Sequence, residues 1–351
     1  MKKIFILSVQ PFAGKTFLTI GLLNKLIEKG YSTGYIKPLG LPPQLIGSSV
    51  YDTDAVLIKE LFKLKESLDI ISPFVITYET MNYLLTGKLG DIKEKIKDSI
   101  AKMKDKDFLI IGGAGNLFTG AILGIDALSL VKETDSKVMV VENFSGDSTI
   151  DNLIGLKKLI DRNFLGATIN RIPQEALKYV KENLRSFLEQ QGIRIFGLFE
   201  KDEILESITV RDLVALLSGR VLCCEDRLDE LVEHFTVGAM DVDSALRYFR
   251  RIPNKAVITG AHRSDIQLAA METSTKVIIL TGGTSANDVV IAKAISKGIP
   301  LVSVEQDTFT TVDRIEFMLG KVRIKEPRKI ERLREMFERS FDIEGFLEAT
   351  R

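Results

Sequence analysis

Apolar and polar positions follow two patterns along the first half of the chain, one typical of strands and one typical of helices. The run Lys3–Val9 is short, apolar and rich in β-branched residues, which predicts a buried strand. Thr16–Lys29 then places leucine and isoleucine at helical spacing and stops at Gly30. Further strands are expected at Ser32–Ile36, Phe108–Ile111, Val138–Val141, Ala167–Asn170 and Arg194–Leu198. Strands separated by helices predict parallel βαβ units, and hence a sheet with helices on both faces.

The second half repeats this pattern on a smaller scale. Its strands are expected at Ala256–Thr259, Lys276–Leu280 and Leu301–Val304, with helices near 265–271 and 287–297 between them. A boundary falls near Glu203–Ile208, because a new helical pattern begins just after it. We therefore predict an α/β protein with a parallel-sheet domain over 1–205 and a smaller α/β domain over 206–325. A C-terminal amphipathic helix over 326–351, packed on its own chain, is expected to follow.

Composition and charge narrow the class of protein. A chain of 351 residues is long for a single core, and 45% apolar with 27% charged residues describes a globular protein. Lys plus Arg and Asp plus Glu both number 48, which argues against a nucleic-acid or acidic-membrane partner. No apolar run is long enough for a membrane span or a signal peptide, so a cytoplasmic location is expected. The only cysteines, Cys223 and Cys224, fit neither zinc-ligand spacing nor a disulfide framework.

The candidate chemistry begins directly after the first predicted strand, in the stretch SVQPFAGKTF. Gly14-Lys15-Thr16 ends a phosphate-binding loop of the form G-x-x-x-x-G-K-[ST], although Val9 stands where the first glycine is usual. A helix that starts here directs backbone N–H groups at an anion, with Lys15 reaching the β- and γ-phosphates and Thr16 binding Mg²⁺. The sequence therefore favours a nucleotide site. The alternative is a strand-to-helix turn that only happens to contain these three residues.

Residues 1–200 resemble the P-loop domain shared by dethiobiotin synthetases and the N-terminal domain of long phosphotransacetylases. The resemblance is carried by six pieces in order: the loop Ser8–Thr16, Tyr35–Leu39, Asp52–Asp54, Ile111–Gly115, Val138–Val141 and Gly166–Arg171. Relatives of this kind often lack the first glycine of the loop, which accounts for Val9. The resemblance implies a parallel-sheet, P-loop NTPase-like fold, with ATP or GTP and Mg²⁺ as cofactors.

The same resemblance implies roles for individual residues. Lys15 and Lys37 would be catalytic and face phosphate or substrate oxyanions, while Thr16 and Asp54 would hold Mg²⁺. The implied nucleotide-binding positions are the loop and one strand end, where Asn170 would recognise the base edge: Ala13, Gly14, Lys15, Thr16 and Asn170. The sequence leaves purely structural alternatives open, in which Lys37 ends a surface strand, Asp54 caps a helix and Asn170 lies in a turn.

One departure from the family pattern concerns the metal. In dethiobiotin synthetases the strand that ends near Ile111 is followed by a glutamate that helps to hold the metal, whereas this chain has Gly112. Water can replace a missing carboxylate in the octahedral shell of Mg²⁺, so binding is compatible with glycine. Neutralisation of transition-state charge by the metal would be less well organised.

Residues 209–325 resemble the DRTGG domain, which lies between the P-loop and catalytic domains of long phosphotransacetylases and beside CBS domains in some pyrophosphatases. The matching residues are Thr259–Asp265, Leu280–Gly283 and Gln306–Phe309, with His262 where an aspartate is usual. All three segments follow predicted parallel strands, so they should meet at the carboxyl edge of one sheet. That edge is a candidate site for an anionic small metabolite, formed by Arg263, Asp265, Thr281, Gly282, Gly283 and Thr308. The alternative is a structural ion pair beside a tight turn.

The composite resembles the N-terminal two-thirds of a long phosphotransacetylase without its acetyl-transferring domain. We expect a homo-oligomeric, nucleotide-binding regulatory or sensor protein with no nucleic-acid or membrane partner. The first alternative is an ATP-dependent ligase of the dethiobiotin synthetase type, in which the γ-phosphate activates a carboxylate or carbamate near Lys37. The second is a protein similar to cobyrinic acid a,c-diamide synthase. That activity needs a nucleophilic cysteine in a glutaminase domain, and Cys223 and Cys224 lie in the wrong domain without its signature.

Overall fold

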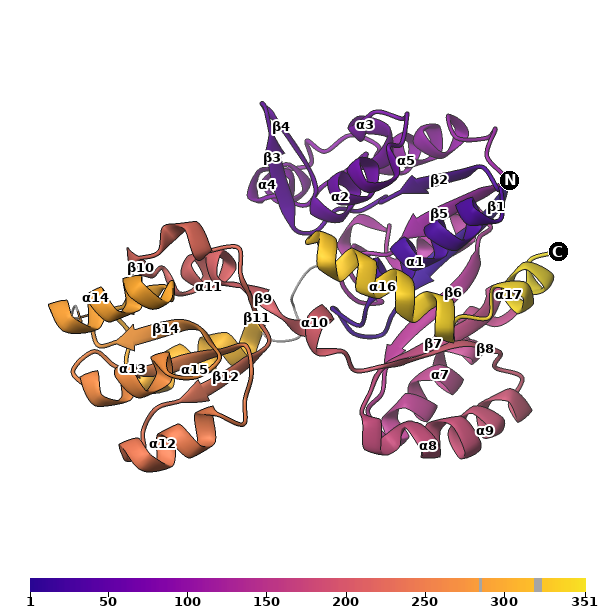
Figure 1. Ribbon diagram of the computed structural model, residues 1–351. Helices are drawn as coiled ribbons and strands as arrows, with labels where there is room; N and C mark the ends of the chain where they lie inside the picture. The colour runs from indigo at the N-terminus through magenta and orange to yellow at the C-terminus, as the bar shows by residue number, and fades with distance from the viewer. Residues whose placement is uncertain (284–285, 319–323) are drawn as a thin grey trace. The chain divides into compact units, whose positions relative to one another are not determined.

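A computed structural model describes residues 1–283, 286–318 and 324–351 and divides the chain into two compact units. The first unit comprises Met1–Lys201 together with Ile324–Arg351, and the second comprises Asp202–Arg323. The second unit is therefore inserted, in sequence, between two parts of the first (Figure 1). Among the helices of the described residues, none is long and apolar enough to cross a membrane.

The first unit is built on a parallel sheet of six strands in the order β2-β5-β1-β6-β7-β8. Its strands are β1 (Lys2–Leu7), β2 (Thr33–Ile36), β5 (Phe108–Gly112), β6 (Lys137–Asn143), β7 (Phe164–Ile172) and β8 (Ile195–Glu200). Most residues of these strands are buried, as expected for parallel strands that are covered on both faces. A separate antiparallel hairpin pairs β3 (Pro43–Ile46) with β4 (Ser49–Asp52).

Helices of the first unit connect these strands in chain order. They are α1 (Lys15–Glu28), α2 (Thr53–Phe62), α3 (Leu68–Ile71), α4 (Tyr78–Leu85), α5 (Ile92–Ala101), α6 (Ala127–Thr134), α7 (Asp147–Ile160), α8 (Leu177–Tyr179), α9 (Arg185–Gln190), α16 (Pro327–Ser340) and α17 (Ile343–Ala349). The crossovers through α6, α7 and α9 run across the sheet in the opposite direction to the crossover through α1. Because such crossovers are right-handed, α1 lies on the face opposite to α6, α7 and α9.

The C-terminal helices complete the face that α1 covers only in part. Helix α16 contacts both α1 and β8, and α17 contacts β8 (Figure 1). Aromatic rings fill the space between these elements: Phe17 of α1 stacks against Phe199 and Phe337, with ring centroids 4.8 and 5.0 Å away. Gly21 makes this packing possible, because a Cβ at that position would overlap the ring of Phe337.

The second unit is a smaller three-layer α/β fold. Its sheet has the order β10-β15-β14-β13-β12, in which β10 (Arg220–Cys223) runs antiparallel and β12 (His234–Val237), β13 (Lys255–Gly260), β14 (Thr275–Thr281) and β15 (Leu301–Val304) are parallel. Short strands β9 (Ile208–Thr209) and β11 (Leu231–Val232) pair beside it. Its helices are α10 (Glu203–Glu206), α11 (Val210–Leu217), α12 (Val242–Phe249), α13 (Ser264–Met271), α14 (Asp288–Lys297) and α15 (Thr308–Met318).

Alternate residues of these strands enter two separate cores. Val257, Ile278 and Leu301 pack with side chains of α12, α13 and α14 on one face of the sheet. Ile258 and Ile279 pack with side chains of α11 and α15 on the other face. A period of two along each strand thus fixes which helices each residue meets.

The predicted fold class, a parallel-sheet P-loop-like domain followed by a smaller α/β domain, is confirmed, and each predicted strand is present to within a few residues. Two strands of the second sheet, β10 and β12, were not predicted from the sequence. The tail expected to form one helix over 326–351 forms two. Phe341 is extended and bridges Gly197, and the Asp342 N–H donates to the Phe196 carbonyl, so β8 interrupts the helix.

We expect Gly21→Ala to destabilise the first unit by about 1–3 kcal/mol, because the new methyl group overpacks against Phe337. Helix propensity alone would predict that Gly21→Ala stabilises the unit, because alanine is the better helix former. Gly155→Ala is the matched control: it lies in α7, nothing lies within 4 Å of its added Cβ, and it should stabilise by up to about 1 kcal/mol. Urea denaturation of both variants measures the change in the free energy of unfolding. A Gly21→Ala variant that is more stable than the wild type would contradict the packing against Phe337.

Candidate functional site

The loop between β1 and α1 is hydrogen-bonded to Asn170, near the carboxyl end of β7. The Asn170 side chain is buried and its Nδ2 donates to the Ala13 carbonyl at 3.0 Å. Gly14 adopts φ 109°, and a Cβ there would collide with the Asn170 amide. Glycine is required at this position for both reasons. Recognition of a base edge through Nδ2 would require this bond to break.

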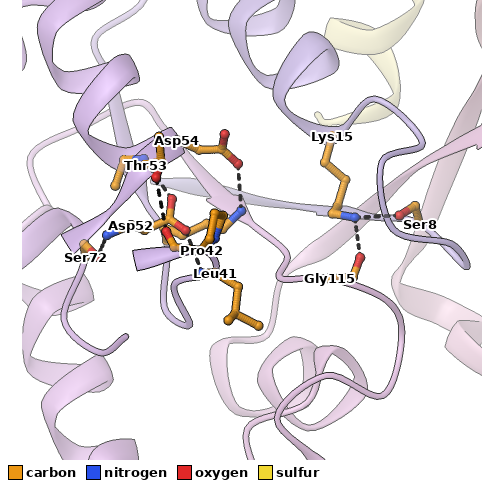
Figure 2. A network of polar contacts seen from close by, with 11 residues as sticks. Ser8, Lys15, Leu41, Pro42, Asp52, Thr53, Asp54, Ser72 and Gly115 are labelled. Atoms are coloured by element: carbon orange, nitrogen blue, oxygen red, sulfur yellow. Dashed lines mark hydrogen bonds and ion pairs between the residues drawn. The ribbon is translucent and has the colours of Figure 1, made fainter. Parts of the chain in front are cut away.

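Lys15, the first residue of α1, turns back over the loop. Its Nζ donates to Ser8 Oγ at 2.8 Å and to the Gly115 carbonyl at 2.5 Å (Figure 2). Burial, followed by the nearby charge of Lys37, lowers the pKa of Lys15 to about 7. In the free protein this ammonium is therefore poorly compensated and readily loses its proton. The half-buried Thr16 side chain makes no hydrogen bond among the described residues.

Beside this loop, the end of β2 and the start of α2 bring a second lysine against a carboxylate. Lys37 Nζ lies 3.2 Å from Asp54 Oδ2, and the two side chains are 4% and 20% exposed. Lys37 is thus a buried group rather than a surface strand end. Asp54 does not cap α2 either; Asp52 does, by accepting a hydrogen bond from the Ala55 N–H at 2.9 Å.

Asp52 is a second buried carboxyl group at this site. Burial raises its pKa to about 6, against the lowering effect of the Lys37 charge. Besides capping α2 it accepts from the Leu41 N–H at 2.8 Å, and its own N–H donates to Ser72 Oγ (Figure 2). These bonds anchor the segment that carries Asp54. The position of Asp54 opposite Lys37 is therefore fixed by its neighbour.

The space that a side chain at position 112 would need is filled by Tyr35. A Cβ on Gly112 would lie 2.5 Å from the Tyr35 hydroxyl and 3.1 Å from Lys37 Cδ. Tyr35 is fully buried, and burial holds the pKa of its hydroxyl well above the usual range. Glycine and tyrosine are therefore a matched pair, and the phenol occupies the room that a longer residue at 112 would take.

Sequence reasoning missed Glu142, the penultimate residue of β6. The residue is 1% exposed, and its Oε1 accepts a hydrogen bond from Asn152 Nδ2 of α7 at 2.8 Å. Burial raises its pKa, against the lowering effects of its hydrogen bonds and of Lys15. The one signal in the sequence is a charged residue at the end of an otherwise apolar strand.

The first half of the predicted site is thus brought together at one sheet edge. The loop residues and Asn170 are in direct contact, and the Lys15 ammonium is close enough to Lys37 and Asp54 to feel their charges. Two lysines and two aspartates therefore lie at this edge of the sheet, with an N-terminal helix end beside them. Such an arrangement suits a polyanion accompanied by a divalent cation.

The second predicted site lies at the carboxyl edge of the second sheet. Thr281 ends β14 and exchanges a hydrogen bond with the Thr308 hydroxyl at 2.8 Å. Gly282 and Gly283 follow with φ 95° and 70°, a backbone that only glycine adopts easily. Their N–H groups donate to the carbonyls of Gln306 and Val304, which joins two of the three motifs.

The third motif contains Arg263, whose guanidinium already forms a bidentate ion pair. Arg263 Nε and one terminal nitrogen donate to the two carboxylate oxygens of Asp265, each at 3.0 Å, and a further bond reaches the Met240 carbonyl. The two side chains are 30% and 47% exposed. The pair is therefore formed at the surface rather than in the core.

We expect Gly112→Ala to destabilise the protein by about 1–3 kcal/mol, because Tyr35 must move to admit the methyl group. Tyr35→Phe removes the nearest atom, the hydroxyl oxygen, and should recover part of this loss in the double variant. Guanidinium denaturation of both single variants and the double variant gives the coupling between the sites. Additive effects would show that the two residues are independent and would contradict the fit described above.

A second expectation concerns Arg263. Because this ion pair is exposed to water, Arg263→Ala should leave the unfolding midpoint nearly unchanged. Asp265→Ala is the matched variant and should behave alike. A cooperative loss of the second unit on either substitution, measured by circular dichroism and limited proteolysis, would instead identify the pair as a structural element.

Two family models match the chain. One, described as an AAA domain, matches residues 2–209, and the other, the DRTGG domain, matches residues 212–318. A phosphate acetyltransferase of Synechocystis is 22% identical over 98% of this chain and 51% of its own length, so the chain spans about half of that relative. An ATP-dependent dethiobiotin synthetase of Methanocaldococcus jannaschii is 26% identical over 58% of this chain and 96% of its own length.

One similar solved structure is the CBS and DRTGG regulatory region of Clostridium perfringens pyrophosphatase in complex with diadenosine tetraphosphate. The match covers 43% of this chain and 72% of the pyrophosphatase chain, with 17% sequence identity and a TM-score of 0.30. The AAA-domain model covers more than half of the residues, including the whole loop, its supporting strands and Lys37. The chain therefore belongs to this family of AAA domains, and its P-loop domain is followed by a DRTGG domain.

Proposed function

We propose that the chain is a regulatory protein whose P-loop unit binds a magnesium nucleoside triphosphate, ATP or GTP, and whose DRTGG unit binds an anionic metabolite. The observation that carries the first part is Lys15: a largely buried ammonium at a helix start, next to a second lysine. A group of this kind is poorly compensated until a polyanion arrives. The relation to dethiobiotin synthetase and phosphate acetyltransferase supports the same assignment.

In this proposal the loop binds the phosphates through its backbone and Lys15. The N–H groups at the start of α1 point at the anion and the helix dipole favours negative charge. Lys15 exchanges its bonds to Ser8 and Gly115 for the β- and γ-phosphates. Asn170 keeps Ala13 and Gly14 in place beneath the nucleotide.

Thr16 and Asp54 fit a magnesium ion, because a hydroxyl and a carboxylate oxygen are ligands that this cation prefers. Asp54 would have to exchange Lys37 for the metal, and Lys37 would then face the terminal phosphate. Gly112 supplies no ligand, so water completes the shell. We therefore propose slow turnover, which suits a sensor better than an enzyme with a rapid cycle.

An ATP-dependent ligase is the second candidate, and Lys37 is the observation in its favour. A buried lysine next to a P-loop could hold an acyl-phosphate or carbamate oxyanion during transfer. The dethiobiotin synthetase of M. jannaschii is matched over nearly its whole length. Substrate-dependent release of ADP by the protein alone would favour this function over sensing.

For the DRTGG unit we propose that the metabolite engages Arg263 and the hydroxyls of Thr281 and Thr308. The Arg263 fork is half-exposed and could exchange Asp265 for a phosphate or carboxylate of the same planar geometry. The joined turns at Gly282 and Thr308 give a rigid edge against which such a ligand can lie. Association of the chain with further copies of itself stays a prediction.

We expect MgATP or MgGTP to raise the melting temperature, and Lys15→Ala to abolish that rise with little change in the free protein. When the nucleotide concentration is one hundred times Kd, binding raises the free energy of unfolding by about 2.7 kcal/mol. Phosphate should raise the pKa of Lys15 above its free value of about 7. Below that pH the residue is protonated in both states. Above it, binding must take up a proton, so affinity should fall by up to about tenfold per pH unit.

Isothermal titration in buffers of different ionisation enthalpy measures this proton uptake directly. Lys132→Ala, an exposed lysine on α6, is the control and should bind nucleotide as the wild type does. A wild-type protein that shows no thermal shift at millimolar nucleotide, with or without Mg²⁺, would rule out the proposed function.

A further inference from the structure

Three side chains with metal-binding atoms meet at the amino end of the second sheet, the edge opposite to the DRTGG motifs. They are Glu203 of α10, Glu233 between β11 and β12, and His234, the first residue of β12. A carboxylate oxygen of each glutamate and a ring nitrogen of the histidine lie within 4.8 Å of one another. All three residues belong to the second unit, so the cluster is a feature of that unit alone.

Strand pairing brings these segments together. Helix α10 leads into β9, and β9 pairs antiparallel with β11, so that Ile208 lies opposite Val232. Glu233 follows Val232 directly, and His234 then begins β12 beside β13. The positions of the three residues thus follow from the backbone of the second unit.

A hydrogen-bonded partner orients the Glu233 carboxylate. Asn254, directly before β13, donates from Nδ2 to Glu233 Oε2 at 2.9 Å, and its carbonyl accepts the Glu233 N–H at the same distance. Asn254 has φ 47°, a left-handed backbone that asparagine adopts more readily than most residues, and its N–H donates to Ser274 Oγ at 3.1 Å. The carboxylates of metal sites are commonly held by outer-shell hydrogen bonds of this kind.

The other two side chains lie close together without being bonded. His234 Nε2 is 3.7 Å from Glu203 Oε2, which is too long for a hydrogen bond. Within the part of the chain that the structure describes, neither side chain makes a hydrogen bond. The imidazole is 28% exposed and the Glu203 side chain 67% exposed, so an ion can reach both from water.

The donor set favours Zn²⁺. Imidazole nitrogen and carboxylate oxygen bind zinc at about 2.0–2.2 Å, and around a tetrahedral ion two such atoms lie about 3.4 Å apart. A small movement of the exposed Glu203 side chain brings the 3.7 Å separation from His234 to this value. Mg²⁺ and Ca²⁺ prefer oxygen ligands throughout. The two carboxylates balance the charge of the ion, and water completes its shell at the fourth position.

We propose that Glu203, Glu233 and His234 bind a zinc ion that fastens α10 to the start of β12. The site uses no residue of the phosphate loop or of the DRTGG edge, and it goes beyond the nucleotide function proposed above. The competing interpretation is a surface ion pair between Glu203 and a protonated His234, which predicts no metal binding and adds little to stability.

Calorimetric titration of the full, untagged and chelator-treated chain with zinc chloride tests this proposal. One Zn²⁺ per chain should bind, with a Kd of about 1 µM or tighter. Because the loss of even an outer-shell partner costs about 10–100-fold in affinity, His234→Ala should weaken binding by at least about 100-fold. Glu203→Gln and Glu233→Gln keep the size of the side chain and should each weaken binding by at least about tenfold.

Matched variants show whether the effect is specific to these residues. His262→Ala removes the other histidine of the chain, and Glu206→Gln changes a second glutamate of α10; both should bind zinc as the wild type does. Asn254→Gly removes the amide but accepts the left-handed backbone, and it should weaken binding about tenfold. A wild type that binds no zinc, or a His234→Ala variant that binds it equally well, overturns the assignment. Circular dichroism establishes folding, and the exposed Glu203→Gln keeps the test decisive if His234→Ala does not fold.

Cobalt separates this cluster from the cysteine pair of the same unit, Cys223 and Cys224, which could take up zinc through sulfur. Co²⁺ bound by nitrogen and oxygen should absorb in the visible range without a sulfur-to-metal band in the near ultraviolet. The double variant Cys223→Ser/Cys224→Ser should bind zinc as the wild type does. A sulfur-to-metal band, or loss of zinc binding in the double variant, would place the ion on the cysteines and overturn the proposal. Neither titration contains nucleotide, so the outcome is independent of the proposed function.

Discussion

Two lysines of like charge are kept close together in a space largely closed to water, and the polar arrangement of the first unit follows from this constraint. Lys15 rests on a hydroxyl and a carbonyl, and Lys37 on the carboxylate of Asp54. The contacts of Lys15 do not fully compensate its charge, since burial and the charge of Lys37 lower the pKa of Lys15 to about 7. A ligand with several negative charges removes the repulsion, whereas a neutral ligand of the same shape does not. We therefore propose that the site selects its ligand by charge before shape.

The sequence was sufficient for the parts of the fold that local pattern determines. The strand before the loop, the helix after it and the three parallel strands of the second sheet lie close to the predicted bounds, because buried runs and helical spacing are local properties. The contact of Thr281 with Thr308 also agrees with the reasoning that carboxyl ends of parallel strands meet. The convergence of Lys15, Lys37 and Asp54 was implied by family resemblance rather than by spacing.

What the sequence could not provide are the relationships between residues distant in the chain. Nothing near position 112 indicates that Tyr35 fills the adjacent space, and nothing near 142 indicates that Asn152 of α7 is the partner of Glu142. Strand β10 pairs antiparallel at the sheet edge, and its four residues, one charged and three apolar, show no alternation that predicts a strand. The break at Phe341 is set by β8 rather than by any helix-ending residue in the tail. In each case tertiary contacts override local preference.

The insertion of the DRTGG unit before α16 has a consequence for how the protein is made. The aromatic cluster around Phe17 closes only when Phe337 arrives, yet some 120 residues of the second unit are synthesised in between. During translation the P-loop unit therefore waits with one face of its sheet covered only in part, by α1, while the DRTGG unit has all of its own strands and can fold first. The packing of α1, which begins at Lys15, would be completed last, by the segment farthest from it in the chain.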